Sequence, residues 1–279
     1  MVIYNNMILP GLTTATTRHL SIEETVEVVC ESGLQGIEWE ANRHVIPGNL
    51  EAAEKARALC DSNKLVIPSY GSYYKAGISE ESGMPFRTVL DTARALEAPC
   101  IRIWAGKQDY DKSNAAYIDR VVSDTLRIAD LAAEKEKTLI FEFHSNSLTN
   151  TTEYALQFAK QVEHPAVTFS WQPIHTHTQE ECERSLSDML PLLNTVHVFH
   201  WNMGLYSNNG YTKEQFVKEG LKWVRHPLCN GSDRWYSYLR IANTTEKKHW
   251  ALLEFTKDDS NEQLLKDAQT LKSLIEKIS

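Results

Sequence analysis

The sequence predicts a single (β/α)₈ barrel, or TIM barrel, over residues 1–279. Three observations support this fold class. The length is close to the ~250 residues typical of one such barrel. Eight short, β-rich runs alternate with helical stretches, which is typical of parallel sheets because parallel neighbours need a crossover connection. Several runs are almost entirely apolar, as strands buried on both faces should be. Eight strands in this length favour a closed barrel over an open sheet.

The eight β-rich runs are expected to form the strands of the barrel. In chain order they are Met7–Leu12, Gly36–Trp39, Leu65–Tyr70, Cys100–Trp104, Thr138–His144, Val167–Trp171, Thr195–Trp201 and Trp250–Phe255.

The first helical stretch carries both a start and a stop signal. Ser21 and Glu24 have the spacing of a capping box, and Gly33 stands where a helix end is expected. Between these signals, apolar residues fall at i, i+4, i+7 and i+8 on one helical face. They are Ile22, Val26, Val29 and Cys30.

The remaining helices are predicted from similar stripes. Ser260 and Gln263 cap the last one, whose apolar positions are Leu264, Ala268, Leu271, Ile275 and Ile278. Others are expected near Leu50–Asn63, Arg87–Leu96, Tyr117–Ala133 and Glu180–Leu193.

One βα unit contains a long interruption between Trp201 and Trp250 that is rich in Asn, Gly and aromatic residues. Insertions of that size in a compact domain are usually functional lids or poorly ordered segments. We therefore expect a lid-like insertion at about residues 202–249, with Tyr206–Trp235 as the segment that excludes water.

The composition argues against several classes of protein. No apolar run approaches the ~20 residues of a membrane span, and the first residues do not read as a signal peptide. A net charge of −8 argues against a nucleic-acid phosphate surface. The five cysteines are scattered without CxxC spacing, so neither a disulfide framework nor a zinc knuckle is expected. We expect small buried thiols in a reducing compartment and a cytoplasmic location.

In a (β/α)₈ barrel, reactive groups stand at the carboxyl ends of the strands. Four polar side chains occupy such positions here: Glu142, Gln172, His197 and Glu254. The first three are separated by 30 and 25 residues, about one βα unit each, which places them on adjacent strands of one rim. Carboxylates and an imidazole that converge there form a reasonable site for Mn²⁺, Mg²⁺, Co²⁺ or Zn²⁺.

Each of these residues also has a purely structural interpretation. Glu142 and Glu254 lie in apolar strands, where a carboxylate must be paired, and a strand-end arginine such as Arg102 is a suitable partner. A single His197 is more often a satisfied core histidine than a ligand. His200 should face away from His197 if the strand is regular, so only one of the two points into the site.

Aromatic residues near the predicted strand ends suit a carbohydrate ligand, because flat apolar rings pack on the C–H face of a sugar. The alternative is that about half of them belong to the core. No Gly-rich phosphate loop is visible, which favours a free sugar or glycoside derivative over a sugar phosphate. The aromatic residues are Trp39, Tyr70, Trp104, Trp171 and Trp201.

Taken in order, several motifs resemble those of one known family. They are Gly36-Ile37-Glu38-Trp39 with His44-Val45-Ile46-Pro47-Gly48, then Ser69-Tyr70-Gly71, then Ala98-Pro99-Cys100-Ile101-Arg102-Ile103-Trp104-Ala105-Gly106. With these motifs the chain resembles, nearly end to end, the sugar isomerases and epimerases that have a xylose-isomerase-like TIM barrel, in the AP-endonuclease-2-like superfamily.

The resemblance implies a single metal site and a set of substrate contacts. The family's Glu, Asp, His and Glu ligands correspond to Glu142, Gln172, His197 and Glu254, and Mn²⁺ or Mg²⁺ is the expected metal. The implied substrate contacts are His175, three residues after the family's Asp, Arg225 after the seventh strand, and His44, Trp104 and Trp171. A homo-oligomer is compatible with the resemblance, since related barrels commonly form dimers or tetramers.

Gln172 departs from the family pattern, because a neutral amide stands where a carboxylate is expected. Its carbonyl oxygen can still coordinate a hard cation. The ligands would then carry about two negative charges, which should weaken metal binding and raise the Lewis acidity of the metal. In the other interpretation, Gln172 hydrogen-bonds the substrate. We favour a retained metal site because both glutamates and the histidine remain.

The implied activity is keto–enol chemistry in carbohydrate metabolism. A metal would stabilise an enediolate, while Glu142 and Glu254 remove and return a proton. Return to the neighbouring carbon gives isomerisation, and return to the other face gives epimerisation. Three alternatives stand beside this: a dehydratase or a lyase that eliminates a keto-glycoside, a non-catalytic barrel that binds a sugar or a partner, and an endonuclease. The last would need more metal ligands and a basic face.

Overall fold

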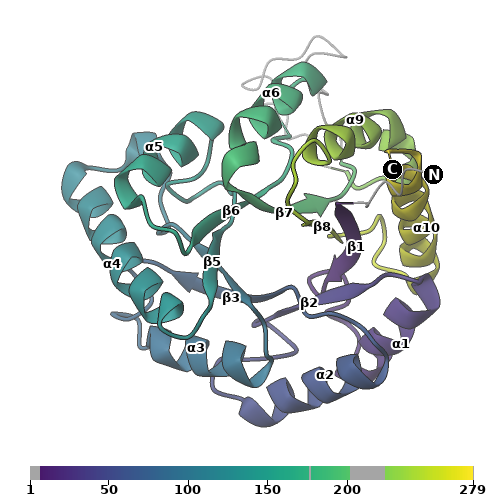
Figure 1. Ribbon diagram of the computed structural model, residues 1–279, viewed down its shortest axis with the longest axis horizontal. Helices are drawn as coiled ribbons and strands as arrows, with labels where there is room; N and C mark the ends of the chain where they lie inside the picture. The colour runs from purple at the N-terminus through teal and green to yellow at the C-terminus, as the bar shows by residue number, and fades with distance from the viewer. Residues whose placement is uncertain (1–6, 176, 202–223, 279) are drawn as a thin grey trace.

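Eight parallel strands pair in chain order and close into a barrel, because β8 also pairs with β1 (Figure 1). This closure confirms the predicted (β/α)₈ barrel. The computed structural model describes residues 7–175, 177–201 and 224–278. The strands are β1 (Ile8–Thr13), β2 (Gly36–Glu40), β3 (Ser69–Lys75), β4 (Cys100–Trp104), β5 (Thr138–Phe141), β6 (Val167–Trp171), β7 (Leu193–Val198) and β8 (His249–Leu253).

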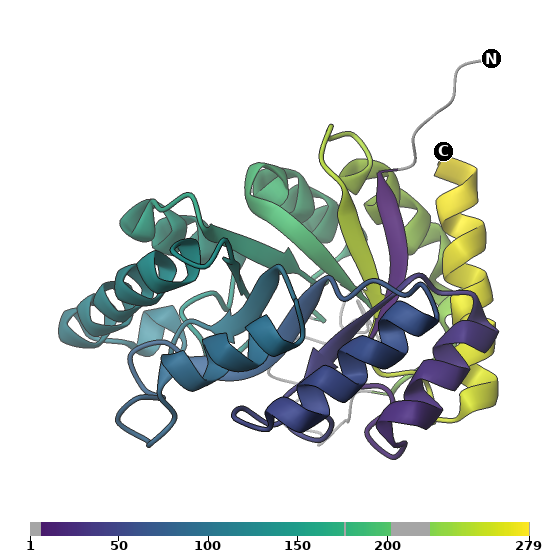
Figure 2. The ribbon, with the colours of Figure 1, turned by 60° about the horizontal axis from the view of Figure 1, so that its bottom comes forward.

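The helices form an outer layer around the strands (Figures 1 and 2). The capping box of the first helix is present, and Gly33 ends that helix in the left-handed conformation. None of the described helices is long and apolar enough to cross a membrane. The helices are α1 (Ile22–Ser32), α2 (Leu50–Ser62), α3 (Phe86–Ala95), α4 (Ala115–Ala133), α5 (Thr152–Val162), α6 (Gln179–Met189), α9 (Ser232–Ala242) and α10 (Asn261–Ile278), with short 3₁₀ turns at Tyr110–Lys112 (η1), Leu190–Leu192 (η2) and Leu228–Gly231 (η3).

Much of the predicted insertion is an ordinary crossover segment. Residues 202–223 lie outside the described residues, but η3 and α9 follow and lead into β8. Trp235, at the end of the predicted lid, is buried in α9 and donates its indole N–H to the Phe199 carbonyl at 2.8 Å. Residues 228–249 therefore belong to the barrel wall, and the expectation of a lid over that part is wrong.

Several strands end earlier than predicted, which changes where the polar residues sit. Glu142, Gln172 and Glu254 each follow directly after the last residue of β5, β6 or β8. In contrast, β3 begins at Ser69, because Pro68 has no N–H to contribute to the ladder. The site residues thus stand at the barrel mouth.

The amino end of the barrel is filled by side chains. A Cβ added to Gly36 would lie 2.5 Å from the Trp250 ring, and one added to Gly11 would lie 2.7 Å from Leu252. Only glycine at these two positions leaves room for the two side chains. The pocket described below is at the opposite, carboxyl end.

The cysteines only partly fulfil the expectation of buried fillers. Cys60 and Cys182 are buried, but Cys30 and Cys229 are exposed and Cys100 is half-buried. All five are free, as expected from their scattered spacing.

Candidate metal centre and substrate pocket

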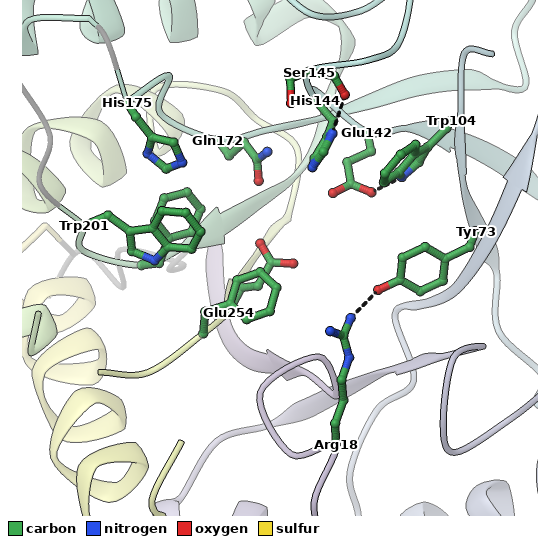
Figure 3. Close-up of a pocket in the computed structure, with 12 residues that line it drawn as sticks. Arg18, Tyr73, Trp104, Glu142, His144, Ser145, Gln172, His175, Trp201 and Glu254 are labelled. Carbon is green, nitrogen blue, oxygen red and sulfur yellow. Dashed lines mark hydrogen bonds between the residues drawn. The ribbon is translucent and has the colours of Figure 1, made fainter. Parts of the chain in front are cut away.

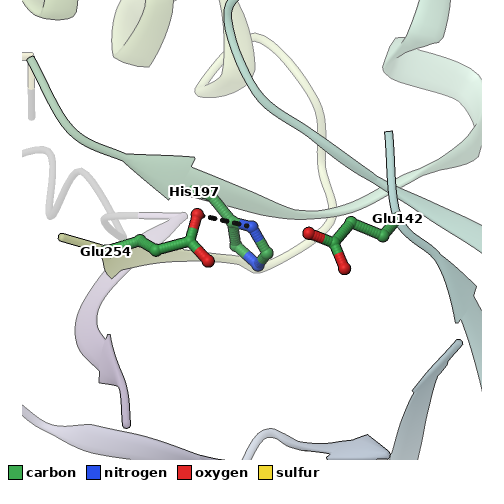
Figure 4. Close-up of side chains that lie close together, drawn as sticks. All are labelled: Glu142, His197 and Glu254. Carbon is green, nitrogen blue, oxygen red and sulfur yellow. Dashed lines mark ion pairs between the residues drawn. The ribbon is translucent and has the colours of Figure 1, made fainter. Parts of the chain in front are cut away.

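Three of the four predicted metal ligands meet at the mouth of the barrel. Glu142, His197 and Glu254 each offer one ligand atom within 4.8 Å of the others (Figure 4). The Nδ1 atom of His197 lies 3.4 Å from Glu254 Oε2. Two ligands at adjacent corners of an octahedral Mg²⁺ shell lie about 3 Å apart, so this spacing suits a shared cation.

The charges in this cluster stabilise one another. Burial alone would lower the pKa of His197, but the Glu254 and Glu38 carboxylates outweigh it and the pKa is raised. Burial alone would raise the pKa of Glu254, but His197 and Arg102 outweigh it and the pKa is lowered. Neither ring nitrogen of His197 has a hydrogen-bond partner among the described residues. An imidazole and two carboxylates with free ligand atoms fit a divalent cation.

Arg102 is also part of this cluster. Its guanidinium is buried and pairs with Glu142 through Nη1 and with Glu38 through Nε at 2.9 Å. Gly71 leaves space for it, since a Cβ there would lie 2.5 Å from Arg102 Nη2. Trp104 Nε1 donates to the same Glu142 oxygen at 2.5 Å. The structural and the metal-binding interpretations of Glu142 therefore coexist, because its second oxygen remains available.

Gln172 lines the same pocket as Glu142 and Glu254. Its Nε2 donates to the Phe143 carbonyl at 2.7 Å, and its amide oxygen points into the pocket (Figure 3). A carbonyl oxygen held in this way can serve either as a neutral metal ligand or as an acceptor for a substrate hydroxyl.

A pocket of about 420 Å³ opens above these groups, within the range of small-molecule sites. Aromatic rings form much of its wall: His144 stacks on Trp104 with ring centroids 4.4 Å apart, and His175 stacks on Trp201 at 4.5 Å. Burial lowers the pKa of His175 to about 4, so this ring is neutral at pH 7. The lining residues are Arg18, Tyr73, Trp104, Glu142, His144, Ser145, Gln172, His175, Phe199, Trp201, Glu254 and Phe255 (Figure 3).

Two predicted substrate contacts lie outside the pocket. Trp171 is buried between the barrel and the helices, where its Nε1 donates to Ser185 Oγ of α6 at 2.9 Å. His44 is also buried, with Nε2 3.1 Å from the Leu20 carbonyl and its ring against Trp39. Neither ring faces the pocket, so both predictions are corrected.

Arg225 lies beside the pocket rather than in it. It lines an adjacent depression of about 360 Å³ that shares Arg18 and Phe255 with the main pocket. Its Nη1 donates to Asp259 at 2.7 Å, and its guanidinium lies 4.8 Å from the centre of the Phe255 ring. Arg225 therefore packs on the ring of Phe255, the residue that follows Glu254.

The aromatic residues divide between the pocket and the core, as the alternative interpretation anticipated. Trp104 and Trp201 line the pocket, whereas Trp39, Tyr70 and Trp171 are buried in the core. His200, which follows β7, does not line the pocket.

A polar cluster that sequence reasoning missed forms part of the pocket wall. Arg18 donates to both oxygens of Glu40, at 2.6 and 2.8 Å, and to the Tyr73 hydroxyl at 2.8 Å (Figure 3). Glu38 and Glu40 alternate on an otherwise apolar strand, which was a visible signal of inward-facing charge. Tyr73 gave no such signal, because its position depends on a left-handed backbone (φ 55°) at the register shift of β3.

Comparisons with known proteins agree with this fold. The model of the xylose isomerase-like TIM barrel family matches residues 26–274. No curated protein sequence matches the chain. Among solved structures, the probable 3-DHS dehydratase AsbF of Bacillus anthracis, involved in petrobactin synthesis, is 20% identical with a TM-score of 0.77, over 95% of this chain and 99% of that one.

Two further structures are similar in shape. A xylose isomerase-like TIM barrel protein from Mycobacterium smegmatis, in complex with magnesium, is 15% identical with a TM-score of 0.72, over 99% of both chains. The 3-keto-D-glucoside 4-epimerase YcjR of E. coli is 14% identical with a TM-score of 0.67, over 96% of this chain and 98% of that one. At these identities the likeness shows the fold alone.

Proposed function

The chain belongs to the xylose isomerase-like TIM barrel family, and on that premise we propose that it is a metal-dependent isomerase or epimerase. It would act through an enediolate on a free sugar or a keto-sugar derivative. The observation that carries this proposal is the meeting of Glu142, His197 and Glu254, of which the two glutamates also line the pocket. Mn²⁺ or Mg²⁺ is the expected cation.

Glu142, His197 and Glu254 would hold the cation, with the amide oxygen of Gln172 as a neutral fourth ligand. When bound, such a cation polarises a carbonyl oxygen and stabilises negative charge that develops on it. The donor set of two carboxylates, one imidazole and one amide oxygen suits Mn²⁺ or Mg²⁺ better than a soft metal.

The two carboxylates also supply the proton transfer. Glu254 is held ionised by His197 and Arg102, so it can accept a proton from a substrate carbon. Glu142 is fixed through one oxygen by Arg102 and Trp104, which leaves the other oxygen to face the pocket. Both carboxyl groups point into the same space (Figure 3), so one can remove a proton and the other can return it.

The walls of the pocket would orient a polyhydroxylated molecule. Trp104, Trp201 and Phe255 offer flat apolar surfaces for C–H groups, while Arg18 and Tyr73 offer polar atoms for hydroxyl groups. Neutral His175 can exchange hydrogen bonds with a hydroxyl without adding charge.

The proposal is tested by Glu142→Gln and Glu254→Gln. With Mn²⁺ present, each variant should lose roughly 10²- to 10⁴-fold in kcat on a responsive keto-sugar, because each removes a proton-transfer group. Glu153→Gln, an exposed residue of α5, is the control and should leave turnover unchanged. Near-wild-type turnover in both site variants would contradict the assignment of Glu142 and Glu254 as proton-transfer groups.

A dehydratase is the second candidate, favoured by the shape similarity to the probable dehydratase AsbF. Removal of a proton next to a carbonyl is common to both reactions, so the same carboxylates would serve. NMR of the products separates them: an isomerase or epimerase conserves all hydroxyl groups, whereas a dehydratase releases water. A purified protein that takes up no metal in excess Mn²⁺ would instead indicate a non-catalytic binding barrel.

A further inference from the structure

Glu38 of β2 is a fully buried carboxylate that does not line the pocket. One of its oxygens, Oε2, accepts a hydrogen bond from Ser69 Oγ at 2.5 Å. The other, Oε1, accepts one from Arg102 Nε at 2.9 Å. A buried carboxylate held by two donors occupies a defined position, and this one lies next to two of the proposed metal ligands.

The Oε1 atom of Glu38 connects to both of these ligands. Through Arg102 it connects to Glu142, because the same guanidinium pairs with both carboxylates. It also lies 4.0 Å from His197 Nε2. The opposite ring nitrogen, Nδ1, faces Glu254 at 3.4 Å. The imidazole of His197 thus has one ring nitrogen on the side of Glu38 and the other on the side of Glu254.

We propose that Glu38 is a positioning residue of the metal centre: its negative charge, 4.0 Å from His197 Nε2, favours the tautomer with the proton on that nitrogen, so that Nδ1 is the atom that binds the cation, and it fixes Arg102 against Glu142. This inference rests on the proposed function. Histidine ligands generally direct their second ring nitrogen at a carboxylate, a carbonyl or a water, which sets the tautomer and the ring orientation.

Charge balance gives Glu38 a second effect in the same direction. Arg102 places a full positive charge beside Glu142, and Glu38 offsets it at 2.9 Å. Without the Glu38 carboxylate, the guanidinium would repel an incoming cation at short range in a site shielded from water. Loss of the carboxylate therefore weakens cation binding both through the orientation of His197 and through the uncompensated charge.

The test measures the Mn²⁺ dissociation constant by calorimetry for wild type, Glu38→Gln and Glu40→Gln. Glu40 is a matched control, since it is also buried on β2 and paired to an arginine, Arg18, that does not touch the cluster. We expect Glu38→Gln to weaken Mn²⁺ binding roughly 10- to 100-fold and Glu40→Gln to leave it unchanged. Glu38→Asp, which keeps the charge, should recover part of the loss.

Further measurements keep the outcome decisive. If Glu38→Gln does not fold, as judged by circular dichroism of the metal-free protein, Ser69→Ala removes one support of Glu38 with little change in volume and should weaken Mn²⁺ binding less strongly but measurably. The absorption spectrum of bound Co²⁺ should also change in Glu38→Gln, because it reports the geometry of the His197 ligand.

Equal Mn²⁺ affinity in wild type and Glu38→Gln overturns the inference while leaving the proposed function in place. An equal loss in Glu40→Gln also overturns it, because the effect would then belong to any buried charge of β2. If wild type itself binds no Mn²⁺, the proposed function fails, and the inference fails with it.

Discussion

At the residue scale, the site is made of charged side chains that the barrel has removed from water. Three of these side chains are no more than 1% exposed, namely Glu38, Arg102 and His197. The carboxylates of Glu142 and Glu254 are also buried. Isolated charges at such positions would be strongly disfavoured, but each carboxylate here has a cationic or hydrogen-bonding neighbour. Removing one partner should therefore affect the others, and effects of single substitutions in this cluster should not be additive.

His175 provides a pH-dependent test at this scale. Its folded-state pKa of about 4 lies below the ordinary value of 6.5, so the unfolded chain binds the proton more readily. The stability that this group contributes is fully present above pH 6.5 and is lost as the pH falls toward 4. Up to about 3 kcal/mol is involved, at about 1.4 kcal/mol per pKa unit.

Urea unfolding of wild type and His175→Phe between pH 7 and pH 4.5 measures this contribution. The phenyl ring can keep the stack on Trp201 but cannot bind a proton. The free energy of unfolding of wild type should fall more steeply with acid than that of the variant. Parallel curves would show that His175 does not have the lowered pKa.

At the element scale, the tryptophans that end β4 and β6, the two strands on either side of β5, have different roles. Trp171 of β6 donates to Ser185 of α6, whereas Trp104 of β4 donates to Glu142 in the pocket. Trp171→Phe should lower the free energy of unfolding by about 1–2 kcal/mol through the lost hydrogen bond, with KM and kcat unchanged. Trp104→Phe should lower kcat because Glu142 loses one of its two supports. Chemical denaturation and steady-state kinetics of both variants check this, and a KM effect in Trp171→Phe would contradict the assignment of Trp171 to the core.

The sequence predicted the strands better than it predicted the helices between them. Short β-rich runs located all eight strands, although the run predicted for β3 overlaps the strand only at Ser69 and Tyr70. In contrast, α5 and α9 were not predicted. The Gly231 position before α9 has no side-chain cap, and the helix is rich in aromatic residues, so it resembled a loop. Trp171 could have been placed correctly from strand alternation, because Gln172 faces inward and its neighbour must face outward. Tyr73 could not, because its direction depends on a bulge formed only in the sheet.

At the scale of the whole molecule, the proposed cation should stabilise the fold, since its ligands come from three different strand ends. A ligand that binds only the folded state adds about 2.7 kcal/mol at 100 times its dissociation constant. For a domain of this size that corresponds to a rise in Tm of roughly 4–6 °C. Scanning calorimetry of EDTA-treated protein with and without Mn²⁺ measures this rise in Tm. The double variant Glu142→Gln, Glu254→Gln should show no rise, and no rise in wild type would contradict a metal centre.

The pairing of β1 with β8 joins Ile8–Leu12 to His249–Leu253, and Thr16 continues the junction by accepting the Phe255 N–H at 3.0 Å. Glu254 emerges on one side of this junction, while Arg18 and Glu38 belong to the other. A partly assembled sheet with this junction open would keep Glu142, His197 and Glu254 on strands β5 to β8 but would lack Arg18 and Glu38 beside them. Closure of the barrel would therefore complete the wall of the proposed pocket and bring Glu38 next to the proposed metal ligands.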